Sequence, residues 1–329
     1  MERYAAIDVG SHSVLIHIAE KDEKGALKTL MDSSIITNLG EGLKETGVIK
    51  HEAMERTIHA LRGFMEKVRE HKVKEVAAIG TMALREAKNS KEFIEKVAKE
   101  LDLTIQVISG EEEARMSHLA VVAGLGIQDE DIVIFDIGGG STEFIFSKGN
   151  EISKRFSINV GALILTDGFL KSDPVKRQEL DSLLAHLDGT FSKIEFPEKV
   201  DRLVGMGGTI TSMTAVECQL VQYDPDIVQG ATLELSAVER QIELYLRKTI
   251  KEKRSIVGLQ PMTADIILAG AAILYSLMKR FGVSSILVSD RGIRHGLMFD
   301  HFGKKDKAIG ASGMGLCSTV SVKETKEGK

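Results

Sequence analysis

The chain contains few of the residues that mark a secreted or membrane protein. Its 329 residues include two cysteines, four prolines and no tryptophan. Cys218 and Cys317 are too few and too distant in sequence for a disulfide framework, which indicates a reducing compartment. The longest apolar run, residues 266–278, is shorter than the roughly 20 residues that span a bilayer. Charged residues in the first ten positions argue against a secretion signal, so we expect a cytoplasmic protein without membrane contact.

Basic residues are not in excess either. Lysine and arginine total 43 against 48 acidic residues, a net charge of −5, and no basic stripe with interleaved aromatic residues is visible. Sequence-specific nucleic-acid binding is therefore not expected. A mildly acidic protein still binds a polyanion if a local site provides the donors, because the overall field gives no attraction.

What the chain does contain is an alternation of strand and helix patterns over a length typical of two domains. Residues 4–37 read as three strands, and residues 51–71 have apolar side chains at helical spacing. Strands and helices then alternate to residue 299, which predicts an α/β fold. Small residues in the segment 263–281 predict a closely packed internal helix.

An internal repeat divides this pattern. The strand at residues 4–9 and the strand at residues 131–137 each have aspartate as the last residue but one, Asp8 and Asp136, and each is followed by glycine. The two aspartates are 128 residues apart. Gly80-Thr81 and Gly208-Thr209 have the same spacing. Two pairs in register predict duplicated lobes with a cleft between them.

Glycine-rich turns in the two halves are candidate phosphate-binding loops. Successive backbone amides in such turns bind phosphate oxygens, and hydroxyl side chains add donors. A plain hairpin is the alternative for the first turn. Three consecutive glycines make it a poor explanation for the second. The candidates are Ser11, His12 and Ser13 in the first turn and Gly138, Gly139, Gly140 and Ser141 in the second.

Carboxylates beside these turns suggest a cation. Asp136 ends an apolar strand, where an unpaired carboxylate is costly, and Glu143 begins the next strand. Mg²⁺ would explain both, because it takes carboxylate oxygens, waters and substrate phosphate. A buried salt bridge is the alternative for Glu143.

Three glutamates follow Ser109. With Ser109 as N-cap, Glu112 completes a capping box, and Glu111 faces the positive end of the helix dipole. Glu113 is not needed for capping and is free to point at a substrate. A solvated acidic first turn is the alternative for all three.

Further candidates follow strands in both halves. Arg85 has the planar guanidinium that suits phosphate, although an exposed helix position is its alternative. Gly207, Gly208 and Thr209 end a strand and open a helix, where backbone amides favour an anion. Residues 289–296 contain two arginines and either line the cleft or cap the last helix.

Together these motifs resemble those of the exopolyphosphatase/guanosine pentaphosphate phosphatase family, a branch of the actin, sugar-kinase and Hsp70 superfamily. The resemblance spans about residues 4–299 and is most specific from Asp136 to Glu143. It implies two ribonuclease-H-like lobes and Mg²⁺. It also places the family's catalytic glutamate on Glu113 and a second essential glutamate on Glu143.

Two departures from the family pattern concern the substrate. His12 stands where asparagine is usual, and Asn38 stands where an arginine is common. The second change removes a cation from the substrate path. The chain also ends before the extra helical domain of long members, which implies a short form.

The expected reaction is release of a terminal phosphate from inorganic polyphosphate or guanosine pentaphosphate. Glu113 activates water, Asp8, Asp136 and Glu143 hold Mg²⁺, and Arg85 with the loops neutralises phosphoryl charge. An ATP-dependent kinase and a non-catalytic polyphosphate or alarmone sensor remain alternatives. We expect lobes at residues 1–125 and 126–303, a loose tail at 304–329, and a homodimer.

Overall fold

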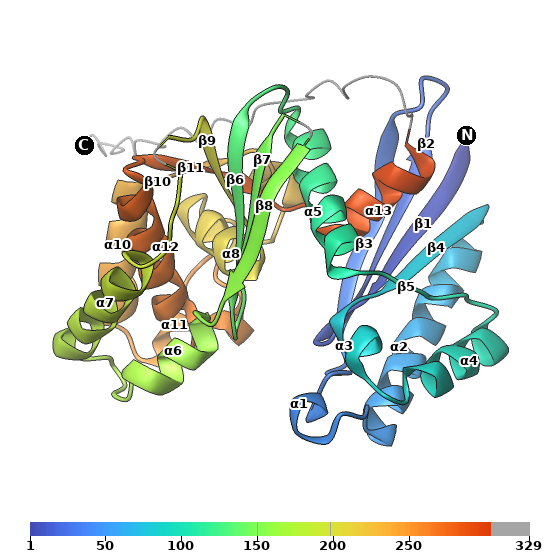
Figure 1. Ribbon diagram of the computed structural model, residues 1–329, viewed down its shortest axis with the longest axis horizontal. Helices are drawn as coiled ribbons and strands as arrows, with labels where there is room; N and C mark the ends of the chain where they lie inside the picture. The colour runs from blue at the N-terminus through green and yellow to red at the C-terminus, as the bar shows by residue number, and fades with distance from the viewer. Residues whose placement is uncertain (150, 198, 304–329) are drawn as a thin grey trace, which may run out of the picture. The chain divides into compact units, whose positions relative to one another are not determined.

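Three antiparallel strands open the first half of the protein, as the sequence predicted. The computed structural model describes residues 1–149, 151–197 and 199–303. The first sheet has the order β3-β2-β1-β4-β5, with β1 antiparallel to β2 and parallel to β4 (Figure 1). In chain order, the elements of the first half are β1 (Glu2–Val9), β2 (Ser13–Lys21), β3 (Leu27–Ile36), α1 (Leu43–Thr46), α2 (His51–Glu70), β4 (Glu75–Gly80), α3 (Met82–Glu86), α4 (Ser90–Leu101), β5 (Gln106–Val107) and α5 (Gly110–Leu125).

Alternation along β1 assigns its side chains to two cores. Ala5, Ile7 and Val9 pack in the core that contains residues of α2 and α4. Tyr4 and Ala6 pack in the other core, with residues of α5 and of the last helix. Because successive side chains of a strand point to opposite faces, Asp8 belongs to the face that α5 covers.

The second sheet repeats this topology. Its order is β10-β11-β9-β6-β7-β8, so the run β8-β7-β6-β9-β11 matches β3-β2-β1-β4-β5 strand for strand. The duplication predicted from the 128-residue spacing is therefore confirmed. The elements are β6 (Asp131–Ile137), β7 (Thr142–Lys148), β8 (Glu151–Ile158), α6 (Ala162–Phe169), α7 (Arg177–Phe191), β9 (Arg202–Met206), α8 (Gly208–Glu217), α9 (Pro225–Val228), β10 (Thr232–Glu234), α10 (Leu235–Leu246), α11 (Ile250–Lys253), a 3-10 turn (Pro261–Thr263), α12 (Ile267–Phe281), β11 (Ser285–Ser289) and α13 (Ile293–Phe302).

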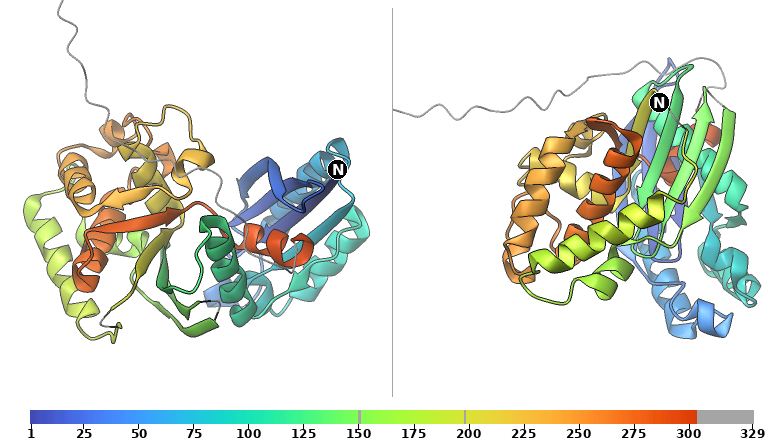
Figure 2. Two further views of the ribbon diagram at one scale, coloured as in Figure 1. Left: turned by 90° about the horizontal axis from the view of Figure 1, so that it is seen from above. Right: turned by 60° about the vertical axis from the view of Figure 1, so that its left-hand side comes forward.

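Helix α12 is the central helix of the second half, where α7 and α10 pack against it (Figure 2). Residues from Ile267 to Leu274 are all buried. A Cβ atom on Gly270 would lie 2.4 Å from Cγ2 of Thr209, which explains why this position has no side chain. The prediction of a closely packed internal helix is confirmed. Its apolar residues are covered within the chain, so they give no support to the expected homodimer.

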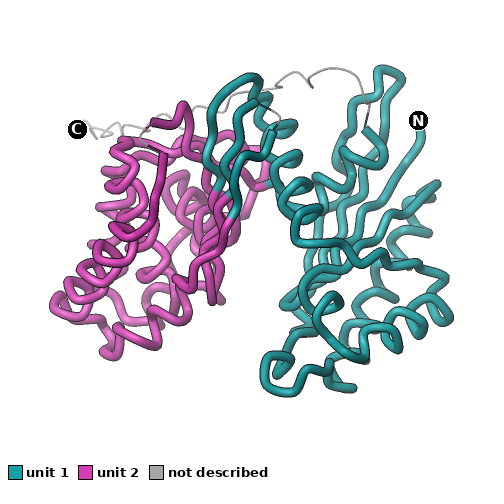
Figure 3. The backbone as a smooth tube through the Cα atoms, in the orientation of Figure 1, with its two compact units in different colours: residues 1–134, 145–155, 291–311 teal, residues 135–144, 156–290, 312–329 magenta. Residues whose placement is uncertain are grey.

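The chain divides into two compact units, which Figure 3 distinguishes by colour. Unit 1 comprises residues 1–134 and 145–155 and the segment that starts at Arg291, and unit 2 comprises residues 135–144 and 156–290. The predicted boundary at residue 125 and the assignment of residues up to 303 to one lobe differ from this division. Helix α13 belongs to unit 1 because Leu297, Met298 and Phe302 pack in the second core of that unit. The expected tail, residues 304–329, lies outside the described residues.

None of the helices in the described part of the chain is long and apolar enough to span a membrane.

Candidate active site

The first anion loop, residues 10–13, joins β1 to β2. The amide of Gly10 donates to the carbonyl oxygen of Ser13 at 3.0 Å and closes the turn. Within the described residues, the amides of Ser11 and His12 donate no backbone hydrogen bond. These two amides are therefore available to an anion.

A neighbouring segment supports this loop from its carbonyl side. The amides of Thr37 and Asn38 both donate to the carbonyl oxygen of His12, at 3.0 and 2.9 Å, and Gly40 donates to Ser11 at 2.8 Å. Asn38 has φ of 49°, a left-handed conformation that asparagine tolerates better than most residues. Because their carbonyl groups are occupied, Ser11 and His12 keep their backbone orientation when no ligand is bound.

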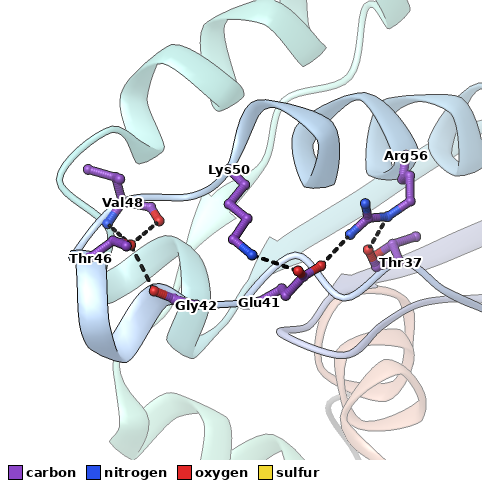
Figure 4. A network of polar contacts seen from close by, with 7 residues as sticks. All are labelled: Thr37, Glu41, Gly42, Thr46, Val48, Lys50 and Arg56. Carbon is purple, nitrogen blue, oxygen red and sulfur yellow. Dashed lines mark hydrogen bonds and ion pairs between the residues drawn. The ribbon is translucent and has the colours of Figure 1, made fainter.

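Ion pairs then hold the supporting segment (Figure 4). Arg56 donates to the carbonyl oxygen of Thr37 at 3.1 Å and to the Glu41 carboxylate at 3.1 Å. Lys50 donates to the same carboxylate at 2.6 Å. Sequence reasoning missed this support, because no local pattern connects residues 37–41 with a helix that begins ten residues later.

Asp8 is a buried carboxylate beside the first anion loop. Its Oδ1 has no hydrogen-bond partner among the described residues. Burial raises the pKa of Asp8 to about 7, with a further upward contribution from the Glu113 charge and an opposing one from Arg294. A buried carboxylate without a partner is costly, and a bound cation would remove that cost.

Helix α5 places Glu113 in the same unit. The capping box is confirmed: the amide of Glu112 donates to Ser109 Oγ at 3.2 Å, and the amide of Ser109 donates to Glu112 at 2.9 Å. Glu113 takes no part in the cap. Its carboxylate accepts a hydrogen bond from Arg85 at 3.2 Å.

Arg85 is anchored as well as paired. The nitrogen that contacts Glu113, Nη1, also donates to the carbonyl oxygen of Ile108 at 3.0 Å. The structure thus brings Asp8, Glu113 and Arg85 together in unit 1, where Arg85 restrains the carboxylate of Glu113.

The second anion loop, residues 138–141, lies between β6 and β7 in unit 2. Gly138 donates to the carbonyl oxygen of Ser141 at 2.9 Å, which repeats the closure of the first loop. Within the described residues, the amides of Gly139, Gly140 and Ser141 donate no backbone hydrogen bond. The first turn of α6 supports the loop, since Ala162 and Leu163 donate to the carbonyl oxygens of Gly138 and Gly139, both at 2.9 Å.

Asp136 precedes the second loop as Asp8 precedes the first. A Cβ atom on Gly207, which has φ of 87°, would lie 2.0 Å from Asp136 Oδ1, so the carboxylate lies directly against the glycine backbone. Burial raises the pKa of Asp136 to about 7, and the Glu143 charge adds to the shift. Glu143 is exposed and accepts hydrogen bonds from Ser141 and, at 3.1 Å, from Ser157.

Helix α8 begins beside Asp136. Its first backbone bond runs from Thr211 to Gly207 at 3.1 Å, so the amides of Gly208 and Thr209 precede the helical hydrogen bonds. The Thr209 hydroxyl is not free for a ligand, because it donates to the carbonyl oxygen of Ile137 at 3.2 Å. Only the backbone of Thr209 remains as an anion donor, which narrows the predicted role of this residue.

A second group of ligand-type side chains lies in unit 1. Asp32 and one ring nitrogen each of His17 and His295 lie within 4.8 Å of one another. His295 Nδ1 accepts from the amide of Gly292 at 3.3 Å, which leaves the proton on Nε2, and Nε2 donates to Asp32 at 2.8 Å. That nitrogen has no lone pair for a metal, so the group is a hydrogen-bonded cluster.

The cluster also contains Arg294, which donates to Asp32 at 2.6 Å. Burial raises the pKa of Asp32, but the hydrogen bond from His295 and the Arg294 charge outweigh it and lower the pKa below its usual value. Burial lowers the pKa of His295 to about 4. Of the two alternatives for residues 289–296, the structure thus favours a structural one for Arg294 and His295, which attach α13 to the first sheet.

The folds and loops described above define the chain as a duplicated α/β protein, with a turn in each half whose central amides donate no backbone hydrogen bond among the described residues. Comparison with known proteins narrows this class. Residues 17–305 match the Ppx/GppA phosphatase family, and the chain belongs to that family, as its motifs indicated.

Several relatives and one solved structure show the extent of the match. The chain is 28% identical over 313 residues to exopolyphosphatase 2 of Mycobacterium tuberculosis, covering 90% of the chain and 98% of the relative. It is 29% identical over 297 residues to the bifunctional 3-dehydroquinate synthase/phosphatase of Fusobacterium nucleatum, with 87% of the chain and 44% of the relative covered. The Aquifex aeolicus Ppx/GppA phosphatase superposes with a TM-score of 0.82 at 34% identity and covers 91% of this chain and 99% of that one.

A third relative is longer. The guanosine-5′-triphosphate,3′-diphosphate pyrophosphatase of Aliivibrio fischeri is 30% identical over 304 residues, covering 90% of the chain but 58% of the relative. The chain therefore spans about half the length of two of the three curated relatives and nearly the whole of the mycobacterial exopolyphosphatase.

Proposed function

We propose that this protein is a Mg²⁺-dependent phosphohydrolase that releases the terminal phosphate of inorganic polyphosphate or guanosine pentaphosphate. The supporting observation is that each unit contains a strand-end aspartate beside a loop whose amides are free for an anion. Membership of the Ppx/GppA phosphatase family and the names of the relatives support the choice of substrates.

The residues present fit a hard divalent cation. Asp8 Oδ1 is buried without a partner among the described residues, Asp136 has a pKa raised by burial, and Glu143 supplies an exposed carboxylate. Oxygen ligands of this kind are those that Mg²⁺ takes together with water and substrate phosphate. When bound, the cation would neutralise charge on the phosphoryl oxygens.

Glu113 is the proposed proton acceptor for the attacking water. Its carboxylate is restrained by Arg85, which in turn is fixed by the carbonyl of Ile108. A restrained carboxylate orients a water without the entropy cost of ordering a free side chain. The free amides of an anion loop would stabilise phosphoryl oxygens during transfer.

The test compares two neighbouring glutamates. Glu113→Gln should reduce phosphate release from tripolyphosphate or guanosine pentaphosphate by about 10²–10⁴-fold, the usual contribution of a general base. Glu112→Gln is the matched control, because glutamine preserves the capping box. Phosphate release is measured with and without Mg²⁺ and without an added acceptor.

Each outcome has a clear meaning. Equal activity of the Glu113 variant and the parent protein would remove Glu113 from the role. Phosphate transfer only when an acceptor is added would favour a kinase. Tight substrate binding by the parent protein with no release at any Mg²⁺ concentration would favour a sensor.

A further inference from the structure

An exposed apolar pair borders the second anion loop. Leu163 and Ile164, in the first turn of α6, are 48% and 50% exposed. Large apolar side chains in water carry an unfavourable hydration free energy, and neighbouring ones form a surface suited to an apolar ligand.

Backbone contacts fix this pair against the loop. Leu163 donates to the carbonyl oxygen of Gly139 at 2.9 Å, and Ile164 donates to the same oxygen at 3.2 Å. A Cβ atom on Gly139 would lie 3.6 Å from Cβ of Leu163, and one on Gly140 would lie 3.9 Å from Cδ1 of Ile164. The side chains of Leu163 and Ile164 therefore border the loop whose amides would bind a phosphate.

The charge of α6 argues against a second phosphate at this position. The helix sequence Ala-Leu-Ile-Leu-Thr-Asp-Gly-Phe contains Asp167 and no basic residue. Inorganic polyphosphate carries charge on every phosphate and favours cations along its path. An apolar pair on a helix without a basic residue would remove water from such a chain without replacing its hydrogen bonds.

We propose that Leu163 and Ile164 are specificity-determining residues that contact the nucleoside of a nucleoside polyphosphate whose phosphates bind the second anion loop. The inference rests on the proposed function and deepens it, because it selects guanosine pentaphosphate over inorganic polyphosphate. A purine has apolar faces and suits such a surface, since ligand sites combine apolar walls with a few polar groups.

The double variant Leu163→Ser/Ile164→Ser tests the proposal. Serine keeps the two backbone amides that donate to the carbonyl oxygen of Gly139, so the loop should persist. We expect kcat/KM for guanosine pentaphosphate to fall about 10–200-fold, mainly through KM, which is the range for lost apolar contacts in a binding pocket. Hydrolysis of tripolyphosphate should not change and serves as the test of folding.

Val257→Ser provides the matched control. Val257 is also 50% exposed. It precedes Gly258, which lies against the backbone of Ala215 in the last turn of α8. This variant should not alter the ratio of the two substrates.

Two kinetic results would overturn the inference and leave the proposed function in place: an equal loss with both substrates, which indicates an effect on the loop itself, or no loss with either. Equilibrium binding of the same two compounds, with Mg²⁺ present, separates the two proposals. If the parent protein hydrolyses neither compound, the proposed function fails. The inference would then stand only if guanosine pentaphosphate binds more tightly than tripolyphosphate and the double variant removes the difference.

Discussion

The first strand of each half, β1 and β6, has an aspartate near its end. Asp8 and Asp136 are held in buried positions where ionisation is unfavourable, and burial raises the pKa of both to about 7. A group whose pKa is higher in the folded state than in the unfolded chain reduces stability as pH rises. The protein keeps both carboxylates in spite of this cost, which is consistent with their proposed role as ligands of Mg²⁺.

This cost predicts a pH dependence. The unfolded carboxyl titrates near 3.8, so metal-free protein should lose stability as pH rises from about 4 to above 7. Asp8→Asn or Asp136→Asn should stabilise metal-free protein at pH 8 by up to about 4 kcal/mol, at 1.36 kcal/mol per pKa unit. Thermal unfolding at pH 5 and pH 8 measures the difference, which should fall to about 1.6 kcal/mol at pH 5, because that pH lies only about 1.2 units above the pKa of the unfolded carboxyl. Added Mg²⁺ should reverse the order of the parent protein and the variants.

Two adjacent glycines provide a second prediction. Gly207→Ala forces a side chain into a left-handed conformation and against Asp136 Oδ1, so the free energy of unfolding should fall by about 1–3 kcal/mol or more. Gly208→Ala is the control, because a Cβ atom there meets nothing within 4 Å. Its stability should stay within about 0.5 kcal/mol of the parent protein. Chemical denaturation of both variants measures these changes, and equal stabilities would contradict the described packing of Gly207.

At the scale of elements, helix termini and their connections carry the candidate site. Ser109 and Glu112 cap α5, and Glu113 follows directly after the capping glutamate. The start of α6 holds the carbonyl side of the second loop, while residues 37–40 hold that of the first. Each anion loop therefore has its own support, one helical and one irregular.

Attachment of α13 is the prediction at this scale. Asp32→Asn removes the partner of Arg294 and weakens the bond from His295, and the two charged side chains are 16% and 18% exposed. Loss of one partner of such a partly buried pair should lower the free energy of unfolding by up to about 3 kcal/mol, the lower end of the range for fully buried pairs. Hydrogen exchange should report faster exchange in α13. The exposed pair Arg177–Glu243 is the control, and Glu243→Gln should cost less than about 1 kcal/mol.

For the whole molecule, the sequence predicted the duplicated α/β architecture because the motifs of the two halves recur at the same spacing along the chain. Strand-end aspartates and Gly-Thr pairs recur at one spacing, and the two sheets share one strand order. The two glycine-containing turns and the capping box could be predicted from the sequence because each depends on residues that are close in the chain.

Contacts between segments that are distant in the chain could not be predicted from the sequence. The residues near Asp32 in the sequence do not indicate that Arg294 and His295 are its partners. The apolar residues of α13 predict a buried helix face but not the core in which that face packs. Arg85 was predicted from its chemistry as a phosphate ligand, but its bond to Glu113 depends on how α3 and α5 pack. Such information lies in the tertiary packing and not in any local pattern.

The late position of α13 has a consequence for biosynthesis. Unit 1 lacks its final helix until the ribosome has translated residues 156–290, which takes about 7–27 seconds at about 5–20 residues per second. During that interval Tyr4, Ala6 and Met116 of the nascent chain await the helix that covers them. The emerging polypeptide is thus exposed to aggregation longest at its oldest part, and a chaperone that shields this apolar face would act there.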